Sequence, residues 1–269
     1  MKKIAVINDI SGFGKCSLTA AIPIISAHGI QCCPLPTGVF SNQTGYDSFK
    51  SVNLTSPMQG FINEWKRLNV GFDGILTGFI PNSAQGEIIS SFIDEFKGEN
   101  TVVTVDPIMG DDGEVYPCYD EKSISAVKAL AKKADIITPN VTELALLSGE
   151  KPSVSYSLCE IEEMSKRQNS PIVITTGIMI DSEIANAVYC NGEFRVIKSK
   201  KLGEHFSGTG DIFSAYVLSE YINSADIFTA VKKASDFIEK AIEETLKNES
   251  EKHYHPDGIE FEKFLDIKK

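Results

Sequence analysis

The chain has 269 residues, of which 42% are hydrophobic and 23% are charged, so it is long enough to bury a full core. Its formal net charge of −11 and its pI near 4.9 argue against a nucleic-acid partner, because the phosphate backbone would be repelled. The first apolar run stops at Asn8, too early for a signal-peptide core or a membrane span, so we expect a cytoplasmic protein with no membrane partner.

Short β-branched runs alternate with segments of helical periodicity along most of the chain. The expected strands lie near 3–7, 31–36, 73–78, 101–105, 136–138 and 171–175. The expected helices lie near 16–28, 56–68, 83–97, 120–133, from 141 onwards, 210–222 and 225–247. Strands separated by a helix need crossover connections, which predicts an α/β fold with a mostly parallel sheet covered on both faces.

Near the carboxyl end the pattern changes. The runs 184–189 and 194–197 flank Asn191-Gly192, a dipeptide favoured in tight hairpin turns, which predicts an antiparallel pair at an edge of the sheet. A charged tail near 248–257 precedes a last short helix. Because no linker, change in composition or internal repeat divides the chain, the sequence predicts one domain over residues 1–269.

Polar residues follow several of the expected strands. In an open parallel sheet, ligands bind outside the carboxyl ends of the strands, so these residues are candidates for a binding site. They include Asn8 and Asp9, Asp106 and Asp111, the segment 138–140, and the segment 175–177.

Gly12-Phe13-Gly14-Lys15 partly matches a phosphate-binding loop. That motif needs glycine at position 9 and serine or threonine at position 16, where this chain has Asp9 and Cys16. The mismatch favours a simple glycine-containing turn that opens the first helix. Asn8, Asp9 and Ser11 remain candidates for lining a substrate pocket.

Gly208-Thr209-Gly210-Asp211 precedes an apolar run with helical character, so it lies at a predicted helix amino terminus. The free N–H groups of a first helical turn, together with the helix dipole, attract an anion. Asp211 would then stand beside a bound phosphate and could accept the proton of an attacking alcohol. The alternative is that Thr209 and Asp211 only cap the helix, and these four residues alone do not decide between the two.

Three carboxylates near the strand ends offer the hard oxygen ligands that Mg²⁺ prefers: Asp106, Asp111 and Glu143. Each of them alone is also common in turns and helix caps, and Asn140 can cap the helix that carries Glu143. Their joint occurrence with the glycine-rich turn before Asp211 favours a site for a magnesium–nucleotide complex.

Five segments together carry a recognisable pattern: residues 40–46, 77–79, 105–111, 134–140 with Glu143, and 208–211. They resemble the vitamin B6 kinase branch of the ribokinase-like superfamily, which contains pyridoxal and pyridoxamine kinases, with hydroxymethylpyrimidine kinases as near relatives. The resemblance runs nearly from end to end. It implies a three-layer α/β/α sandwich with a mostly parallel central sheet, assembled as a homodimer.

The resemblance also implies an activity and a set of roles. The activity is phosphorylation of the 5′-hydroxymethyl group of pyridoxal, pyridoxamine or pyridoxine, with ATP, Mg²⁺ and K⁺ as candidate cofactors. Asp211 is the implied base, and the amides of Gly208, Thr209 and Gly210 form the implied anion hole. The implied ATP-binding residues are Asp106, Asn140, Glu143, Thr175 and Thr176, the implied metal ligands are Asp106, Asp111 and Glu143, and residues 111–121 match a flap over the nucleotide. The implied substrate-binding residues are Asn8, Ser11, Val39, Thr44 and Phe79.

Departures from the pattern fall on the substrate side. Many pyridoxal kinases carry serine at the position of Asn8, histidine at that of Gln43 and tyrosine at that of Phe79. A site that recognises polar groups discriminates strongly through such partners, so hydroxymethylpyrimidine kinase activity is a second candidate. A candidate of another class is a non-catalytic protein that binds pyridoxal phosphate.

Overall fold

A nine-stranded sheet forms the centre of the computed structural model, which describes residues 1–203, 205–248, 254–255 and 257–265. The strand order is β11-β10-β9-β8-β5-β4-β1-β2-β3. The strands are β1 (Lys3–Ser11), β2 (Gln31–Phe40), β3 (Ser51–Asn53), β4 (Gly74–Thr77), β5 (Val102–Val105), β8 (Ile136–Ile137), β9 (Ile172–Ile180), β10 (Glu183–Cys190) and β11 (Glu193–Lys200). The six strands from β9 to β2 in this order pair in parallel, and antiparallel strands flank them on both sides.

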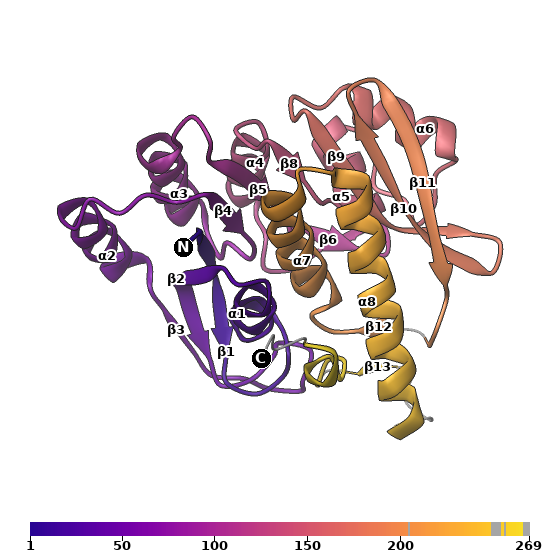
Figure 1. Cartoon of the computed structure of the whole chain (residues 1–269), viewed down its shortest axis with the longest axis horizontal. Helices are drawn as coiled ribbons and strands as arrows, with labels where there is room; N and C mark the ends of the chain where they lie inside the picture. The colour runs from indigo at the N-terminus through magenta and orange to yellow at the C-terminus, as the bar shows by residue number, and fades with distance from the viewer. Residues whose placement is uncertain (204, 249–253, 256, 266–269) are drawn as a thin grey trace.

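Helices cover both faces of this sheet (Figure 1). They are α1 (Ser17–Ala27), α2 (Thr55–Arg67), α3 (Ser83–Phe96), α4 (Glu121–Ala131), α5 (Val141–Ser148), α6 (Leu158–Lys166), α7 (Thr209–Ser224) and α8 (Ile227–Asn248). Helices α1, α7 and α8 pack on one face, and α2 to α6 pack on the other. The expected three-layer α/β/α sandwich is confirmed.

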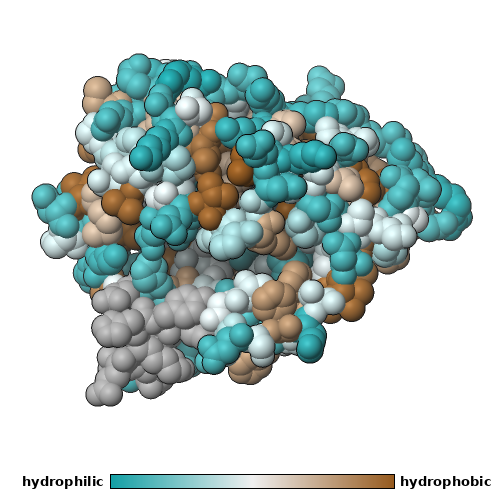
Figure 2. Space-filling view, turned by 180° about the vertical axis from the view of Figure 1, so that it is seen from behind, coloured by the Kyte–Doolittle hydropathy of each residue, from teal (hydrophilic) through white to brown (hydrophobic). Residues whose placement is uncertain are grey.

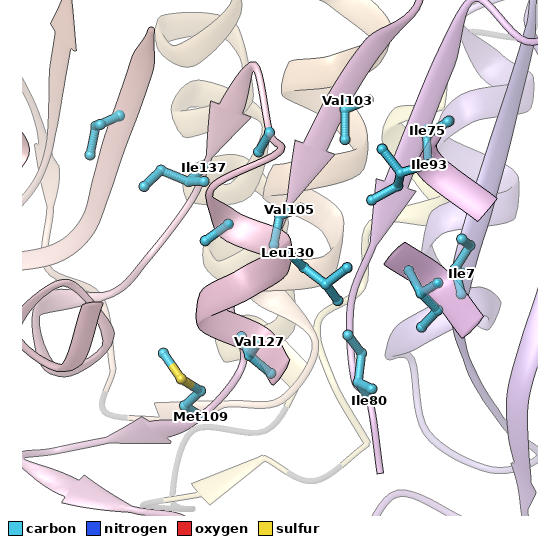
Figure 3. Close-up of a cluster of buried hydrophobic side chains, with 14 of the residues drawn as sticks. Ile7, Ile75, Ile80, Ile93, Val103, Val105, Met109, Val127, Leu130 and Ile137 are labelled. Carbon is cyan, nitrogen blue, oxygen red and sulfur yellow. The ribbon is translucent and has the colours of Figure 1, made fainter. Parts of the chain in front are cut away.

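The burial pattern of β1 explains why both faces are covered. Successive side chains of a strand point to opposite faces, and here Ile4 and Val6 enter the core beside α1 and α7. Ala5 and Ile7 enter the core on the other side of the sheet. Figure 3 shows part of that second core, where strand residues such as Val105 meet Leu130 of α4. A strand buried on both faces has the continuous apolar run that the sequence shows.

Three strands extend further than their apolar runs predicted, and one of them is β2, which we expected to end near residue 36 but which continues to Phe40. We expected the first strand to end near residue 7, but β1 continues to Ser11 because its polar end still pairs with β2, with a register shift between Asn8 and Ile10. We expected another strand to end near residue 175, but β9 continues to Ile180. Beyond its last parallel contact with β8, at Val173, β9 keeps an antiparallel partner in β10, which satisfies its backbone hydrogen bonds.

The predicted hairpin is confirmed. Strands β10 and β11 pair antiparallel, and both Asn191 and Gly192 have the positive φ angles that a tight hairpin turn requires, +52° and +80°. The sequence did not indicate the short edge strand β3, the hairpin of β6 (Gly110–Asp111) and β7 (Glu114–Val115), or the pair of β12 (His205–Phe206) and β13 (Tyr254–His255). The last short helix is a 3₁₀ turn at Glu262–Phe264, and most of the expected charged tail lies outside the described residues.

In the part of the chain that the structure describes, no helix combines the length and the apolar character needed to cross a bilayer. On the face seen in Figure 2, hydrophobic side chains form small separate patches within a largely hydrophilic surface.

The single tryptophan offers a probe of core packing. Trp65 lies in an aromatic cluster, with its ring centroid 5.5 Å from that of Phe72 and 6.0 Å from that of Phe92. We predict that Phe92→Ala lowers the free energy of unfolding by about 3–5 kcal/mol, because it leaves a cavity in this cluster. Denaturant unfolding followed by Trp65 fluorescence measures the change.

The control is Phe61→Ala on α2, where the side chain is 45% exposed and its loss should change stability by less than about 1 kcal/mol. Equal losses in the two variants would contradict the packing described for Phe92.

Candidate active site

The candidate site lies where the carboxyl ends of the parallel strands meet the amino terminus of α7. A Cβ atom added to Gly210 would lie 3.8 Å from Oδ2 of Asp106, so the Gly208–Asp211 turn sits directly over the end of β5. This juxtaposition brings together residues separated by about a hundred positions in the sequence. The strand-end rule for open α/β sheets predicted that these residues lie together.

The turn before α7 has little room for side chains. Gly208 is the N-cap of α7 and has a φ of +77°, a conformation that favours glycine. A Cβ atom at this position would stand only 2.0 Å from the carbonyl oxygen of Lys15. Both the backbone angle and the close approach of the chain before α1 therefore require glycine here.

Asp211 occupies the third position of α7 and receives a side-chain hydrogen bond. Nδ2 of Asn8 donates to its Oδ1 at 2.9 Å, and the backbone N–H of Ser17 lies close enough to the carboxylate to stabilise its ionised form. Burial raises the pKa of Asp211 to about 6, and the two donors limit that rise because they stabilise the ionised form. The helix-cap interpretation explains neither of these long-range partners.

Hydrogen bonds hold both the oxygen and the nitrogen of the Asn8 side-chain amide. Its Oδ1 accepts hydrogen bonds from the backbone N–H groups of Phe79 and Asp9, both at 2.9 Å, and its side chain is only 3% exposed. Gly78 makes room for it, because a Cβ atom there would lie 2.3 Å from Nδ2 of Asn8. Asn8 was expected to bind substrate, but this geometry favours a role in orienting Asp211.

Asp106 is a buried carboxylate at the end of β5, 8% exposed. Its Oδ2 accepts a hydrogen bond from Oγ of Ser214 at 3.2 Å, and that hydroxyl lies 2.9 Å from Oγ1 of Thr138. Burial raises the pKa of Asp106 to about 7, and the nearby charge of Asp211 adds to the effect.

Glu143 and Asn140 form a capping box at the start of α5. Oε2 of Glu143 accepts from the backbone N–H of Asn140 at 2.9 Å, and Oδ1 of Asn140 accepts from that of Glu143 at 2.9 Å. Oε1 of Glu143 accepts from the backbone N–H of Met109 at 3.1 Å. Burial holds the pKa of Glu143 well above its usual range, and the nearby Asp106 raises it further. The capping role suggested by sequence is thus real, and it ties α5 to the loop after β5.

The hairpin β6–β7 forms the first part of the segment expected to act as a flap. Nδ2 of Asn140 donates to the carbonyl of Gly110 at 2.8 Å, and the backbone N–H of Gly113 donates to Oγ1 of Thr142 at 2.8 Å. On its other side, Asp112 lies 3.8 Å from the ring of His205, just before the turn at Gly208. The hairpin therefore borders the acidic side of the site.

Three acidic groups share this region and interact electrostatically: Asp106, Asp111 and Glu143. Within the described ranges, no group of three His, Cys, Asp or Glu side chains gathers closely enough to hold a metal ion alone. Asp106 and Asp111 both raise the pKa of Glu143, so the three carboxylates form one region of excess negative charge. These carboxylates fit a divalent cation whose remaining ligands are phosphate oxygens. Kinases hold Mg²⁺ in this shared way.

The two threonines of β9 differ in accessibility. Thr175 is fully buried, and its hydroxyl has no hydrogen-bond partner among the described residues. Thr176 is half-buried, and its backbone N–H donates to the carbonyl of Pro139 at 2.9 Å, beside Asn140. The geometry favours Thr176 for contact with a nucleotide.

The expected substrate-side residues fall into two groups. Asn8 and Ser11 are buried and bound to other protein groups. Val39 is 43% exposed, Thr44 is exposed and Phe79 is half-buried, with its ring near those of Phe40 and Tyr119 at centroid distances of 6.3 and 6.1 Å.

Sequence reasoning missed two features of the structure. One is the left-handed backbone of Ser17, whose φ of +51° no sequence pattern reveals. The other is a hollow of about 400 Å³ near Phe13 and Tyr46, whose rings lie 5.7 Å apart. The hollow is lined by Phe13, Ser41, Asn42, Tyr46, Asp47 and Ser48.

The whole chain is similar to known kinases in sequence and in fold. The family model described as phosphomethylpyrimidine kinase matches residues 18–256. The chain belongs to this kinase family. A crystallised protein of Bacteroides thetaiotaomicron, named provisionally as a phosphomethylpyrimidine kinase, is 34% identical with a TM-score of 0.93, over 98% of this chain and 92% of that one. Its second crystal form contains pyridoxal and is similar at 35% identity, with a TM-score of 0.91 over 98% and 94% of the two chains.

Curated relatives of this family member bear the name pyridoxal kinase. The pyridoxal kinase PdxY of Leifsonia xyli is 24% identical over 91% of this chain and 90% of its own length. The pyridoxal kinase of Bos taurus is 27% identical over 77% of this chain and 74% of its own length. The expected ribokinase-like fold and the resemblance to B6 kinases are confirmed, and the chain is a small-molecule kinase.

The buried acidic groups predict an unusual pH dependence of stability. The pKa values of Asp106 and Asp211 are raised in the folded protein, to about 7 and about 6, so the folded state binds protons more tightly than the unfolded state. Their contribution to stability is therefore lost as pH rises through that range. Without Mg²⁺ or nucleotide, we expect the Tm to fall between pH 5 and pH 8 because of these two groups.

Asp106→Asn tests whether the buried charge of Asp106 causes this fall in Tm, because the amide carries no charge. At pH 8 the variant should be more stable than the wild type, by on the order of 1–3 kcal/mol, and the gap should shrink at pH 5. Calorimetry at both pH values measures this. A variant that is destabilised equally at both values would rule out a buried charge at Asp106.

Proposed function

We propose that this chain is an ATP-dependent kinase that phosphorylates the 5′-hydroxymethyl group of pyridoxal, pyridoxamine or pyridoxine. The observation that carries the proposal is the Asp211 carboxylate in the first turn of α7, with its hydrogen bond from Asn8 and its pKa of about 6. Most of this carboxylate is ionised at pH 7, and the raised pKa makes it a stronger base than an ordinary aspartate. It can therefore take the proton of an alcohol that attacks a phosphoryl group.

The turn before Asp211 supplies the anion site in this mechanism. The backbone N–H groups of Gly208, Thr209 and Gly210 lie at the positive end of the dipole of α7. Donors fixed in advance stabilise the negative charge that develops on the transferring group without a cost of reorganisation. The glycines allow the phosphoryl oxygens to approach the backbone closely.

The acidic groups opposite the turn would bind Mg-ATP. Asp106 and Asp111 are the candidates to hold Mg²⁺, whereas both oxygens of Glu143 accept backbone hydrogen bonds, which favours a contact through water. Bound Mg²⁺ would neutralise the phosphate charge that these carboxylates would otherwise repel. Asn140 and Thr176 border the same region, and K⁺ remains a candidate further cation.

The choice of a B6 vitamer rests on the relatives and on the exposed apolar residues of the acceptor side. The Bacteroides protein, 35% identical, was crystallised with pyridoxal, and curated relatives are named pyridoxal kinases. Val39 and Phe79 offer partly exposed apolar surface to a flat ring. The resemblance also implies a cytoplasmic homodimer, for which light scattering of the purified protein is the direct test of assembly.

We predict that a substrate panel with Mg-ATP gives the highest kcat/KM for one of the three B6 vitamers. Hydroxymethylpyrimidine is the comparison substrate, because the family model carries the name of a pyrimidine kinase. A higher kcat/KM on the pyrimidine alcohol would reassign the acceptor and leave the phosphoryl-transfer site unchanged. ATP consumption that depends on an added vitamer would exclude the non-catalytic binding protein.

Asp211→Asn should lower kcat by about 10²–10⁴-fold and leave the Kd for ATP nearly unchanged, because it removes the base and keeps the anion site. Steady-state kinetics and nucleotide titration measure the two effects. The matched control is Asp236→Asn, the same chemical change at an exposed carboxylate of α8 that pairs with Lys232. If Asp211→Asn keeps wild-type turnover, another group must act as the base.

A further inference from the structure

A second carboxylate beside Asp211 has no part in the mechanism above. Asp9, near the end of β1, is 6% exposed, and both of its oxygens are occupied. Oδ1 accepts a hydrogen bond from Oγ of Ser17 at 2.6 Å, and Oδ2 accepts one from Oγ of Ser11 at 3.1 Å. A buried charge costs free energy unless it serves a defined set of donors, so its partners indicate what it does.

The first of these partners has a strained backbone. Ser17 begins α1 with a φ of +51°, in the left-handed region that residues other than glycine rarely adopt. Such a conformation persists only where surrounding contacts hold it, and the hydrogen bond to Asp9 is the shortest side-chain contact that Ser17 makes. The chain before α1 packs against Gly208, and the backbone N–H of Ser17 lies close enough to the carboxylate of Asp211 to stabilise its ionised form.

The second donor to Asp211 is also tied to Asp9. The backbone N–H of Asp9 donates to Oδ1 of Asn8 at 2.9 Å, and Nδ2 of Asn8 donates to Oδ1 of Asp211 at 2.9 Å. The side chain of Asp9 thus fixes one donor to Asp211, and its main chain fixes the other. Ser11, which was expected to bind substrate, is buried, and its hydroxyl donates the second side-chain hydrogen bond to Asp9.

We propose that Asp9 and Ser17 are positioning residues for the catalytic base: the Asp9 carboxylate holds Ser17 in the left-handed conformation, and the Ser17 N–H thereby fixes the orientation of Asp211. This inference rests on the proposed role of Asp211. It assigns no contact with substrate to either residue. Orientation matters here because a displacement of about 1 Å in a reacting group can cost roughly 100-fold in rate.

Asp9→Asn tests the proposal with little change in shape. We expect kcat to fall by about 10- to 100-fold, while KM for ATP and for the vitamer stay within about twofold, because the variant disturbs only the base. In an Asp211→Asn background, the same change should cause no further loss, since there is no base left to orient. Ser17→Ala removes the same hydrogen bond from the other side and should give the same loss of kcat.

The matched control is Thr19→Val. Thr19 lies in the same first turn of α1 and donates to the carbonyl of Cys16 at 2.6 Å, but it does not contact Asp9. A purely structural role for Asp9 would predict equal losses of kcat in the wild-type and Asp211→Asn backgrounds, and that result would overturn the proposal. So would unchanged kcat in both Asp9→Asn and Ser17→Ala.

A crystal structure of Asp9→Asn gives an answer that does not depend on activity. We expect Ser17 to leave the left-handed region, or its N–H to lose the contact with Asp211. A variant that retains both features overturns the proposal, even if the wild-type enzyme proves inactive on every vitamer. Inactivity of the wild type would instead overturn the proposed function. If Asp9→Asn does not fold, the structure of Ser17→Ala answers the same question through the contact between Ser17 and Asp211.

Discussion

The site depends on the close approach of two chain segments, the turn before α7 and the chain before α1. The carbonyl of Lys15 occupies the space where a side chain at Gly208 would be, so the amino-terminal ends of both helices lie beside Asp211. Helix α7 carries the carboxylate, and the first residue of α1 places a backbone N–H near it. The positive ends of two helix dipoles thus meet at the place where a phosphoryl group would carry negative charge.

Opposite this positive region lies an excess of buried negative charge. Asp106 and Glu143 are both held by hydrogen bonds from neighbouring groups, and burial raises the pKa of each. Such an arrangement is unfavourable for the isolated protein and favourable once a cation and a nucleotide occupy the site. The free energy of binding is therefore partly set by the cost of keeping these carboxylates together before the ligand arrives. Stability and function are opposed in this region of the fold.

Sequence patterns predicted the layered fold and the grouping of the candidate site residues, because both depend on the order of apolar runs and on the residues after them. They predicted the turn at Gly208 and the cap at Asn140 for the same reason: such motifs are local. They did not predict which side chains of the acceptor side face outward. Asn8 and Ser11 turned inward because contacts with Asp211 and Asp9, set by tertiary packing and by the bulge in β1, decide their orientation. The conformation of Ser17 has no local signature at all.

The contact between Asn8 and residue 79 has an evolutionary consequence. Asn8 accepts from the backbone N–H of Phe79 and makes no demand on its side chain, while its other end holds Asp211. Mutation can therefore change the ring at position 79, and with it the fit of the proposed acceptor, without moving the proposed base. Residue 78 must stay glycine and the backbone at 78–79 must keep its position, since a side chain at Gly78 would overlap Asn8. A lineage with this architecture can exchange one flat alcohol for another through side chains alone, which is consistent with a family whose members carry the names of both pyrimidine and pyridoxal kinases.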